Sequence, residues 1–265
     1  MRAFGARLLG AMVLVAVMAG CATVPPNAGS NPADPWERYN RHVSEFNDRF
    51  DAVVTRPVAL AYVGVVPQPV RDCVSNFFTN AADVPSFLNN VLQAKPTAAA
   101  TDLCRVAINT TIGLLGCFDV ARNMGLERTD EDFGQTLGYW GIGQGPYFVW
   151  PFLGPATVRD SVGRVAGFYT NPIDYISDVP TRNVLWGLAL IDTRANLLSL
   201  DRLLDGALDR YQFIRDAYLQ RRLNQVFDGN PPRTRIDGED DDSGPPNAAP
   251  SVGEKSDQPS GAPAR

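Results

Sequence analysis

The stretch FGQTLGYWGIGQGPYFVWPFLGP, residues Phe133–Pro155, is the part of the chain around which the rest is organised. Its beginning is typical of a helix end, and it then passes through glycines at alternate positions, Gly141, Gly143 and Gly145. Glycine reaches positive φ and allows close backbone approach, so this spacing predicts a pliable loop. Pro146 opens an almost wholly apolar run in which the prolines argue against an ordinary helix or a central strand. A loop that is both irregular and apolar must be buried under the chain or face something other than water.

The N-terminus is predicted to be a targeting segment. Residues Met1–Gly20 begin with basic residues and contain an apolar run, Leu8–Met18, that is shorter than the roughly 20 residues of a membrane-spanning helix. Small residues lead directly into Cys21, which resembles the bacterial lipobox and predicts that Cys21 is the lipidated N-terminus of the mature chain. The alternative is an ordinary signal peptide followed by a free cysteine. Ala22 in place of an aspartate favours the outer membrane among lipoprotein destinations.

Composition predicts one large domain with flexible ends. The 265 residues divide into a signal peptide (1–20), a lipidated tether (21–33), a helical domain (34–228) and a disordered tail rich in Pro, Gly and Asp (229–265). After Cys21 no apolar stretch approaches spanning length, so membrane contact is expected through the anchor and by lying in one leaflet. The net charge of −5 argues against nucleic acid as a partner.

The hydrophobic pattern predicts an all-α fold. Asp34 is placed to cap a first helix, with Pro35 at the first helical position and Glu37 completing a capping-box spacing. We expect the apolar face of this helix to contact either the membrane or neighbouring helices. Its members are Trp36, Tyr39, Val43, Phe46 and Phe50.

Prolines and glycines divide the remainder into further helices. We expect separate helices before and after the Asp83–Pro85 segment, and a long helix from Thr97 to about Gly116. A helix starts at Thr157–Asp160, and helical periodicity runs from Thr181 to about Phe227 with a break near Gly206. No run of alternating residues predicts a strand. The apolar side of the Thr97–Gly116 helix is expected to comprise Leu103, Val106, Ala107, Ile112 and Leu115.

Three cysteines remain in the domain, Cys73, Cys104 and Cys117. An oxidising compartment allows one disulfide and leaves one thiol, but the pairing cannot be deduced from sequence. Buried unreactive thiols are an equally good interpretation.

The sequence contains no recognisable catalytic or cofactor motif. His42 is its only histidine, which excludes multi-histidine metal sites and leaves no separate base for a serine or cysteine nucleophile. There is no G-x-S-x-G elbow, and the Gly141–Gly145 glycines lack the preceding strand and nearby lysine of a phosphate-binding loop. We interpret the chain as a non-enzyme without metal or cofactor.

Segments spread over the mature domain resemble, in order, the VacJ/MlaA family of outer-membrane lipoproteins. They are Asp34-Pro-Trp-Glu-Arg-Tyr-Asn40, Arg56-Pro-Val, Val66-Pro-Gln-Pro-Val-Arg71, Ser75-Asn-Phe77, Asn109-Thr-Thr-Ile-Gly113, Phe118-Asp-Val-Ala121, Phe133-Gly-Gln-Thr-Leu-Gly138, Gly141-Ile-Gly-Gln-Gly-Pro-Tyr147, Pro151-Phe-Leu-Gly154 and Thr193-Arg-Ala. The lipobox agrees with this resemblance.

The resemblance implies a ring of helices in the periplasmic leaflet of the outer membrane, with a central amphipathic channel for phospholipids. The family removes mislocalised phospholipid from the outer leaflet, binds trimeric porins and passes lipid to a soluble periplasmic carrier, which maintains lipid asymmetry. In this chain it assigns a loop on the lipid path to Gly141, Gly143, Gly145, Pro146 and Tyr147, and a membrane-facing or ring-packing helix to Trp36, Tyr39, Phe46, Asn47 and Phe50. A competing interpretation is that the glycines only permit a tight turn.

Two other functions stay open on sequence alone. A purely structural, porin-associated envelope lipoprotein shares the anchor and the helices but needs no amphipathic cavity. A phospholipase acting on misplaced lipid conflicts with the missing elbow and the single histidine.

Overall fold

The computed structural model describes residues 24–232. The predicted signal peptide, Cys21 and nearly all of the predicted tail lie outside the described residues. The elements are α2 (Glu37–Phe50), η1 (Asp51–Thr55), α3 (Arg56–Val65), α4 (Gln68–Leu92), α5 (Pro96–Thr111), α6 (Val120–Asn123), α7 (Phe133–Tyr139), β1 (Tyr147–Trp150), β2 (Gly154–Thr157), α8 (Val158–Phe168), η2 (Pro172–Tyr175), α9 (Val179–Leu197), η3 (Leu198–Leu200), α10 (Asp201–Asp205) and α11 (Arg210–Val226).

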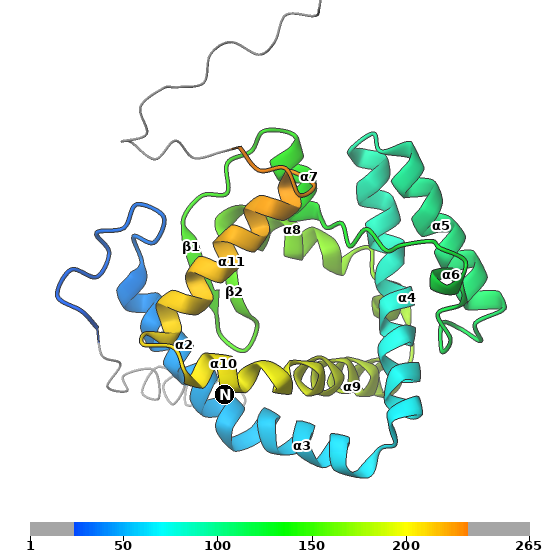
Figure 1. Ribbon diagram of the computed structural model, residues 1–265, viewed down its shortest axis with the longest axis horizontal. Coiled ribbons are helices and arrows are strands. Elements are labelled where there is room, and N and C mark those ends of the chain that lie inside the picture. Colours follow the sequence, from blue (N-terminus) through cyan, green and yellow to red (C-terminus); the bar gives the residue numbers. More distant parts are fainter. Residues whose placement is uncertain (1–23, 233–265) are drawn as a thin grey trace, which may run out of the picture. The chain divides into compact units, whose positions relative to one another are not determined.

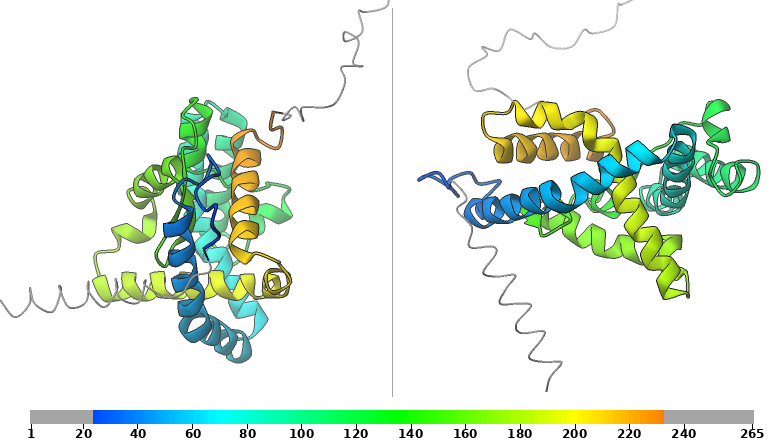
Figure 2. Two further views of the ribbon diagram at one scale, coloured as in Figure 1. Left: turned by 90° about the vertical axis from the view of Figure 1, so that its left-hand side faces the viewer. Right: turned by 90° about the horizontal axis from the view of Figure 1, so that it is seen from below.

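The helices follow one another around a circuit (Figure 1). Helix α2 continues through the π-helical turn η1 into α3, and α3 packs on α9. Helix α4 contacts α5, α7 and α9, α7 contacts α8 and α11, and β1 returns the chain to α2. Figure 2 shows α10 and α11 on one side of α3, and α9 crossing from the other side. The predicted all-α, ring-like fold is confirmed, apart from one small hairpin.

Helix α4 corrects the expected break before Pro85. It is a single helix of 25 residues that contains Pro85 in its interior. Proline there removes one backbone hydrogen bond, but α4 packs along α5 and buried polar side chains join the two helices. Asp83 accepts from Arg105 at 3.0 Å, and Ser86 donates to Asp102 at 2.7 Å. These contacts stabilise α4 as a continuous helix across Pro85, where helix propensity predicts a break.

Helix α5 turns a polar face toward the interior. Its buried residues are Ala99, Asp102, Arg105 and Asn109, a face that is almost entirely polar. The predicted apolar side points outward, since Leu103 is 52% exposed. The helix ends at Thr111 instead of Gly116.

The segment after α5 is fastened to α4. The chain turns through positive φ at Leu114, Leu115 and Gly116, and a disulfide then joins Cys117 to Cys73. Cys104 is free and exposed. The pairing that the sequence left open is therefore Cys73 with Cys117.

The apolar run after Pro146 forms a β-hairpin that was not predicted. Strand β1 pairs antiparallel with β2, Tyr147 opposite Thr157 and Trp150 opposite Gly154. Positive φ at Phe152 and Gly154 turns the chain between them. Both strands are edges of a two-stranded sheet, where prolines are tolerated, and β1 alternates buried and half-buried residues.

Helix α2 holds the hairpin through two asparagines that are two helical turns apart. The Asn40 amide donates to the Tyr147 carbonyl at 3.1 Å and accepts from the Val149 N–H at 2.9 Å. The Asn47 amide donates to the Trp150 carbonyl at 2.9 Å and accepts from the Phe152 N–H at 2.7 Å. Each amide therefore pairs with the free edge of β1 or its turn as another strand would.

Asp34 does not cap α2, contrary to the prediction. The helix begins at Glu37 without a side-chain cap, and the wholly buried Asp34 carboxylate is used in tertiary contacts instead. It accepts from Asn40 at 2.8 Å, from the Tyr211 hydroxyl at 2.5 Å and from Arg215 at 3.3 Å. This carboxylate joins the beginning of the domain to α11.

Replacing Asn40 by Ala is expected to lower the free energy of unfolding by about 3 kcal/mol, because buried groups of Asp34, Tyr147 and Val149 each lose a partner. Chemical unfolding followed by circular dichroism measures the change. Arg38→Ala on the exposed side of the same helix is the control. Equal stability of the two variants would contradict the proposed role of Asn40.

Candidate functional site

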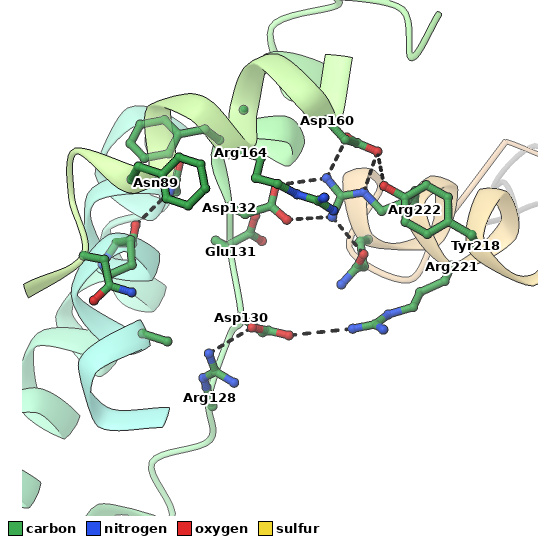
Figure 3. Close-up of a pocket in the computed structure, with 18 of the residues that line it drawn as sticks. Asn89, Arg128, Asp130, Glu131, Asp132, Asp160, Arg164, Tyr218, Arg221 and Arg222 are labelled. Atoms are coloured by element: carbon green, nitrogen blue, oxygen red, sulfur yellow. Dashed lines mark hydrogen bonds and ion pairs between the residues drawn. The ribbon is translucent and has the colours of Figure 1, made fainter. Parts of the chain in front are cut away.

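A cavity of about 470 Å³ opens among α4, the segment before α7, α8, α9 and α11 (Figure 3). Its wall combines apolar surface from Pro85, Phe133, Phe168 and Trp186 with charged side chains of both signs. The charged members are Arg128, Asp130, Glu131, Asp132, Asp160, Arg164, Arg221 and Arg222. Such a lining can hold a polar group at one place and apolar chains beside it.

Two glycines allow the elements of the cavity wall to meet. A Cβ on Gly163 of α8 would lie 2.3 Å from the Gly134 backbone nitrogen of α7. A Cβ on Gly134 would lie 2.5 Å from an Asp160 carboxylate oxygen and 2.6 Å from an Arg222 nitrogen. Any larger residue would separate α7 from α8 and from the charged cluster beside them.

Arg222 is the centre of that cluster. Its guanidinium donates to Asp160 at 2.8 and 3.1 Å and to Asp132 at 2.7 and 2.9 Å, and the Tyr218 hydroxyl donates to Asp160 at 2.8 Å. Burial raises the pKa of the Asp160 carboxyl, but the hydrogen bonds and charge of Arg222 outweigh burial and hold it below its ordinary value. Arg222 thus joins α11 to the N-terminal ends of both α7 and α8.

A second set of charges lies on the α4 side of the cavity. Arg128 donates to Asp83 at 2.8 Å and is paired with Asp130 at 2.9 Å. Arg221 approaches Asp130 at 4.0 Å from α11. Glu131 is paired with Lys95 at 3.2 Å. Each carboxylate on the cavity wall therefore has a cationic partner.

Many large apolar side chains of the described domain are exposed, while much of its inside is polar. Buried polar and charged side chains outnumber buried apolar ones within residues 24–232. Large apolar side chains are instead exposed on most helices, among them Leu60 and Val65 on α3, Ile112 after α5, and Val162 on α8. None of the described helices has the length and hydropathy that crossing a membrane requires. An apolar exterior of this extent is typical of a surface that does not face water.

The glycine loop lies apart from the residues that line the cavity. Gly141 and Gly145 have positive φ, whereas Gly143 does not and has open space around it. Arg159 holds the loop, since its side chain donates to the Ile142 carbonyl at 3.3 Å and its N–H to the Gln144 carbonyl at 3.2 Å.

Pro146 and Tyr147 lie where the loop enters the hairpin. The Pro146 carbonyl accepts from the Val158 N–H at 3.1 Å. Tyr147 is 1% exposed and packs in the core against Tyr211 and Tyr218. Burial raises the pKa of Tyr147 well above its ordinary value.

The aromatic residues of the first helix gather against the hairpin. The rings of Trp36 and Tyr39 pack on Phe148, with centroids 6.0 and 5.3 Å away. Phe46 and Phe50 contact Phe152, with centroids 5.1 and 5.0 Å away. Together with Asn47 they form one surface with the hairpin, and none of them lines the cavity.

Sequence reasoning missed the charged residues of the cavity. The available signals were the acidic run Asp130–Asp132 directly before FGQTLG and the paired Arg221-Arg222 near the end of the helical region. Neither signal indicates that residues 132, 160 and 222 meet. That juxtaposition depends on the fold.

An apolar exterior, a polar interior and an internal cavity of mixed lining define a class of helical lipid-contacting proteins. Comparison with known proteins places the chain within this class. The family model of the MlaA lipoprotein matches residues 32–225, and the chain belongs to that family.

Individual relatives agree with this assignment. The "Intermembrane phospholipid transport system lipoprotein MlaA" of Escherichia coli (strain K12) is 39% identical over 218 residues, covering 80% of this chain and 84% of that protein. The protein of the same name from Haemophilus influenzae is 31% identical over 227 residues, covering 84% and 91% of the two chains. A solved structure described as "Structural basis for maintenance of bacterial outer membrane lipid asymmetry" aligns with a TM-score of 0.65 at 36% identity, covering 74% of this chain and 99% of that one.

Replacing Arg222 by Leu is expected to lower the free energy of unfolding by about 3 kcal/mol at neutral pH, because the buried Asp160 keeps only the Tyr218 hydroxyl and the more distant Arg159 as partners. Arg221→Leu is the matched control and should change stability by less than about 0.5 kcal/mol, since that side chain is 71% exposed.

Acid should affect the two variants differently. The pKa of Asp160 is lower in the folded chain than the ordinary carboxyl pKa, so the ionised carboxylate stabilises the fold at pH values above that ordinary pKa. This stabilisation is lost as the pH falls through the pKa of the folded state. The control should therefore lose this stability in acid, while the Arg222→Leu variant should lose less of it, since only Tyr218 and Arg159 still favour the ionised carboxylate. Parallel pH profiles from thermal unfolding would contradict the role given to Arg222.

Proposed function

We propose that the chain provides an amphipathic route by which mislocalised phospholipids leave the outer leaflet of the outer membrane and pass to a periplasmic carrier, which maintains lipid asymmetry. The observation that supports this function best is a cavity of mixed polar and apolar lining inside helices whose outward surface is apolar. The names of the relatives, which refer to intermembrane phospholipid transport, agree with it.

The chemistry of a phospholipid explains why both surfaces are needed. Its headgroup is charged, so burying it away from polar groups is unfavourable. Its acyl chains are apolar, so exposing them to water is unfavourable as well. Charged side chains and aromatic rings share the wall of one cavity here, and the exterior offers apolar contact to lipid tails.

The proposed arrangement of the chain follows its organisation. Residues 1–20 are removed as a signal peptide, Cys21 bears the acyl chains, and residues 21–33 tether the helical domain 34–228 to the periplasmic leaflet. Two or more acyl chains anchor stably where one does not. Incorporation of labelled palmitate at Cys21 tests the anchor, and loss of membrane retention in Cys21→Ala is the expected result.

Partners follow from the same proposal. A trimeric porin would hold the domain at the bilayer, and a soluble carrier would receive lipid at the periplasmic side. We further propose that the chain transports without catalysing a reaction, since the lone His42 offers no base for a hydrolytic nucleophile on the cavity wall.

The purified chain is expected to retain phospholipid extractable by organic solvent, and to release no fatty acid when incubated with labelled phospholipid. Lipid analysis by mass spectrometry measures both. A purely structural porin-associated lipoprotein would retain none, and a phospholipase would release fatty acid. Either result would reject the proposed transport function.

The glycine loop is proposed to move during transport, and Gly143 is the position that tests this idea. Its φ is not positive, an added side chain meets open space, and its N–H donates to no backbone carbonyl of the described residues. Gly143→Pro should stiffen the loop without damaging the fold, so outer-leaflet phospholipid should accumulate while abundance and membrane attachment persist.

Gly143→Ala is the matched control, because alanine fits the same space and keeps rotation about φ. Outer-leaflet phospholipid can be measured in cells by its accessibility to an added phospholipase. Equal levels in the two variants would mean that the glycines only turn the chain. Gly141 is unsuitable for this test, since its φ of 88° is incompatible with proline.

A further inference from the structure

One cation on the cavity wall has no carboxylate partner. Arg222 is paired with Asp132 and Asp160, and Arg128 and Arg221 share Asp130. Among the ion pairs of residues 24–232, none includes Arg164, although its side chain lines the same cavity. Each carboxylate on the cavity wall has another cationic partner, so Arg164 is a guanidinium that no carboxylate of the described residues holds in an ion pair (Figure 3).

The position of Arg164 is fixed by the hairpin. Its two terminal nitrogens donate to the Leu153 carbonyl at 3.4 Å and the Pro155 carbonyl at 3.2 Å. A guanidinium has five N–H donors, and these two bonds leave the others without a protein acceptor among the described residues. Neutral carbonyls orient the group but leave its charge available to an anion.

The neighbours of Arg164 on α8 arrange the cavity wall by polarity. Asp160, Arg164 and Phe168 are spaced at four residues, lie on one face of the helix, and all line the cavity. This face of α8 therefore carries two charged side chains followed, one turn beyond Arg164, by the aromatic ring of Phe168. A ligand with an anionic group beside an apolar body fits this order.

We propose that Arg164 binds the phosphate of the transported lipid, so that the cavity selects phosphate-bearing glycerolipids over neutral ones. This inference rests on the proposed transport function and names the residue that recognises the substrate class. The planar guanidinium fork matches two phosphate oxygens, and charge-assisted hydrogen bonds to phosphate are stronger than bonds to neutral carbonyls. The phosphate diester is common to all diacyl phospholipids, so the headgroup beyond it is not specified by this contact.

The test compares two lipids that differ only in the phosphate-bearing headgroup. The full mature chain is equilibrated with vesicles containing labelled dioleoylphosphatidylethanolamine or dioleoylglycerol, and lipid retained per protein is measured after re-isolation. The variants are Arg164→Gln, Arg164→Lys and, as a control on an exposed arginine outside the cavity, Arg38→Gln. Circular dichroism and thermal unfolding of each variant report whether the fold is intact.

We expect Arg164→Gln to retain about tenfold less phosphatidylethanolamine than the unaltered chain, with dioleoylglycerol retention unchanged. Arg164→Lys should be intermediate, because it keeps the charge but loses the fork. Arg38→Gln should match the unaltered chain. If Arg164→Gln unfolds, the comparison is made on Arg164→Lys and on the lipid preference of the unaltered chain.

Three results would overturn the inference. Equal phosphatidylethanolamine retention by Arg164→Gln and Arg38→Gln would mean that Arg164 does not bind the phosphate. Equal loss of both lipids would assign Arg164 to holding the hairpin alone. Equal retention of the two lipids by the unaltered chain would mean that the phosphate is not recognised. Absence of any lipid on the unaltered chain is a different result, because it rejects the proposed transport function itself.

Discussion

The apolar exterior is the constraint on which the rest of this structure depends. A water-soluble domain holds together because apolar side chains leave water for the interior, but here many large apolar side chains stay outside. The stability of the folded domain must then depend to a greater extent on buried hydrogen bonds and ion pairs. Such pairs stabilise only when every member is satisfied, and removing one partner leaves a buried charge. The many buried polar residues are therefore the core of this fold.

These polar contacts join segments that are distant in sequence. Asp34 fastens the start of the domain to Tyr211 and Arg215 on α11, and Arg222 fastens the same helix to the starts of α7 and α8. Asn109 and Asp119 pair where α5 meets α6. Several of these residues belong to the segments that resemble the family, Asp34, Asn40, Asn109 and Asp119 among them. In the structure they are mainly structural, because they satisfy one another inside the ring.

Local chemistry predicted the start of α8 correctly, but it was wrong about the start of α2, where Asp34 makes tertiary contacts instead of a cap. Thr157 accepts a hydrogen bond from the Asp160 N–H, as its capping pattern indicates. The break expected near Pro85 is absent because contacts with α5 override the proline. Helix α5 buries a polar face because Asp102 and Arg105 bond to side chains of α4. The hairpin lacked a turn signal of the usual kind. The cavity was beyond prediction, since Asp132, Asp160 and Arg222 come together only through the close approach of Gly134 and Gly163.

Helix α8 contacts the glycine loop, the charged cluster of the cavity and the β-hairpin. Arg159 contacts the glycine loop at Ile142, the adjacent Asp160 binds Arg222 on the cavity wall, and Arg164 one turn later contacts the hairpin at Leu153 and Pro155. Packed elements shift as units instead of deforming continuously. A displacement of the loop therefore acts on the same short helix that positions the cavity charges, while Asn40 and Asn47 fix the far side of the hairpin to α2. The loop can thus influence the cavity without lining it.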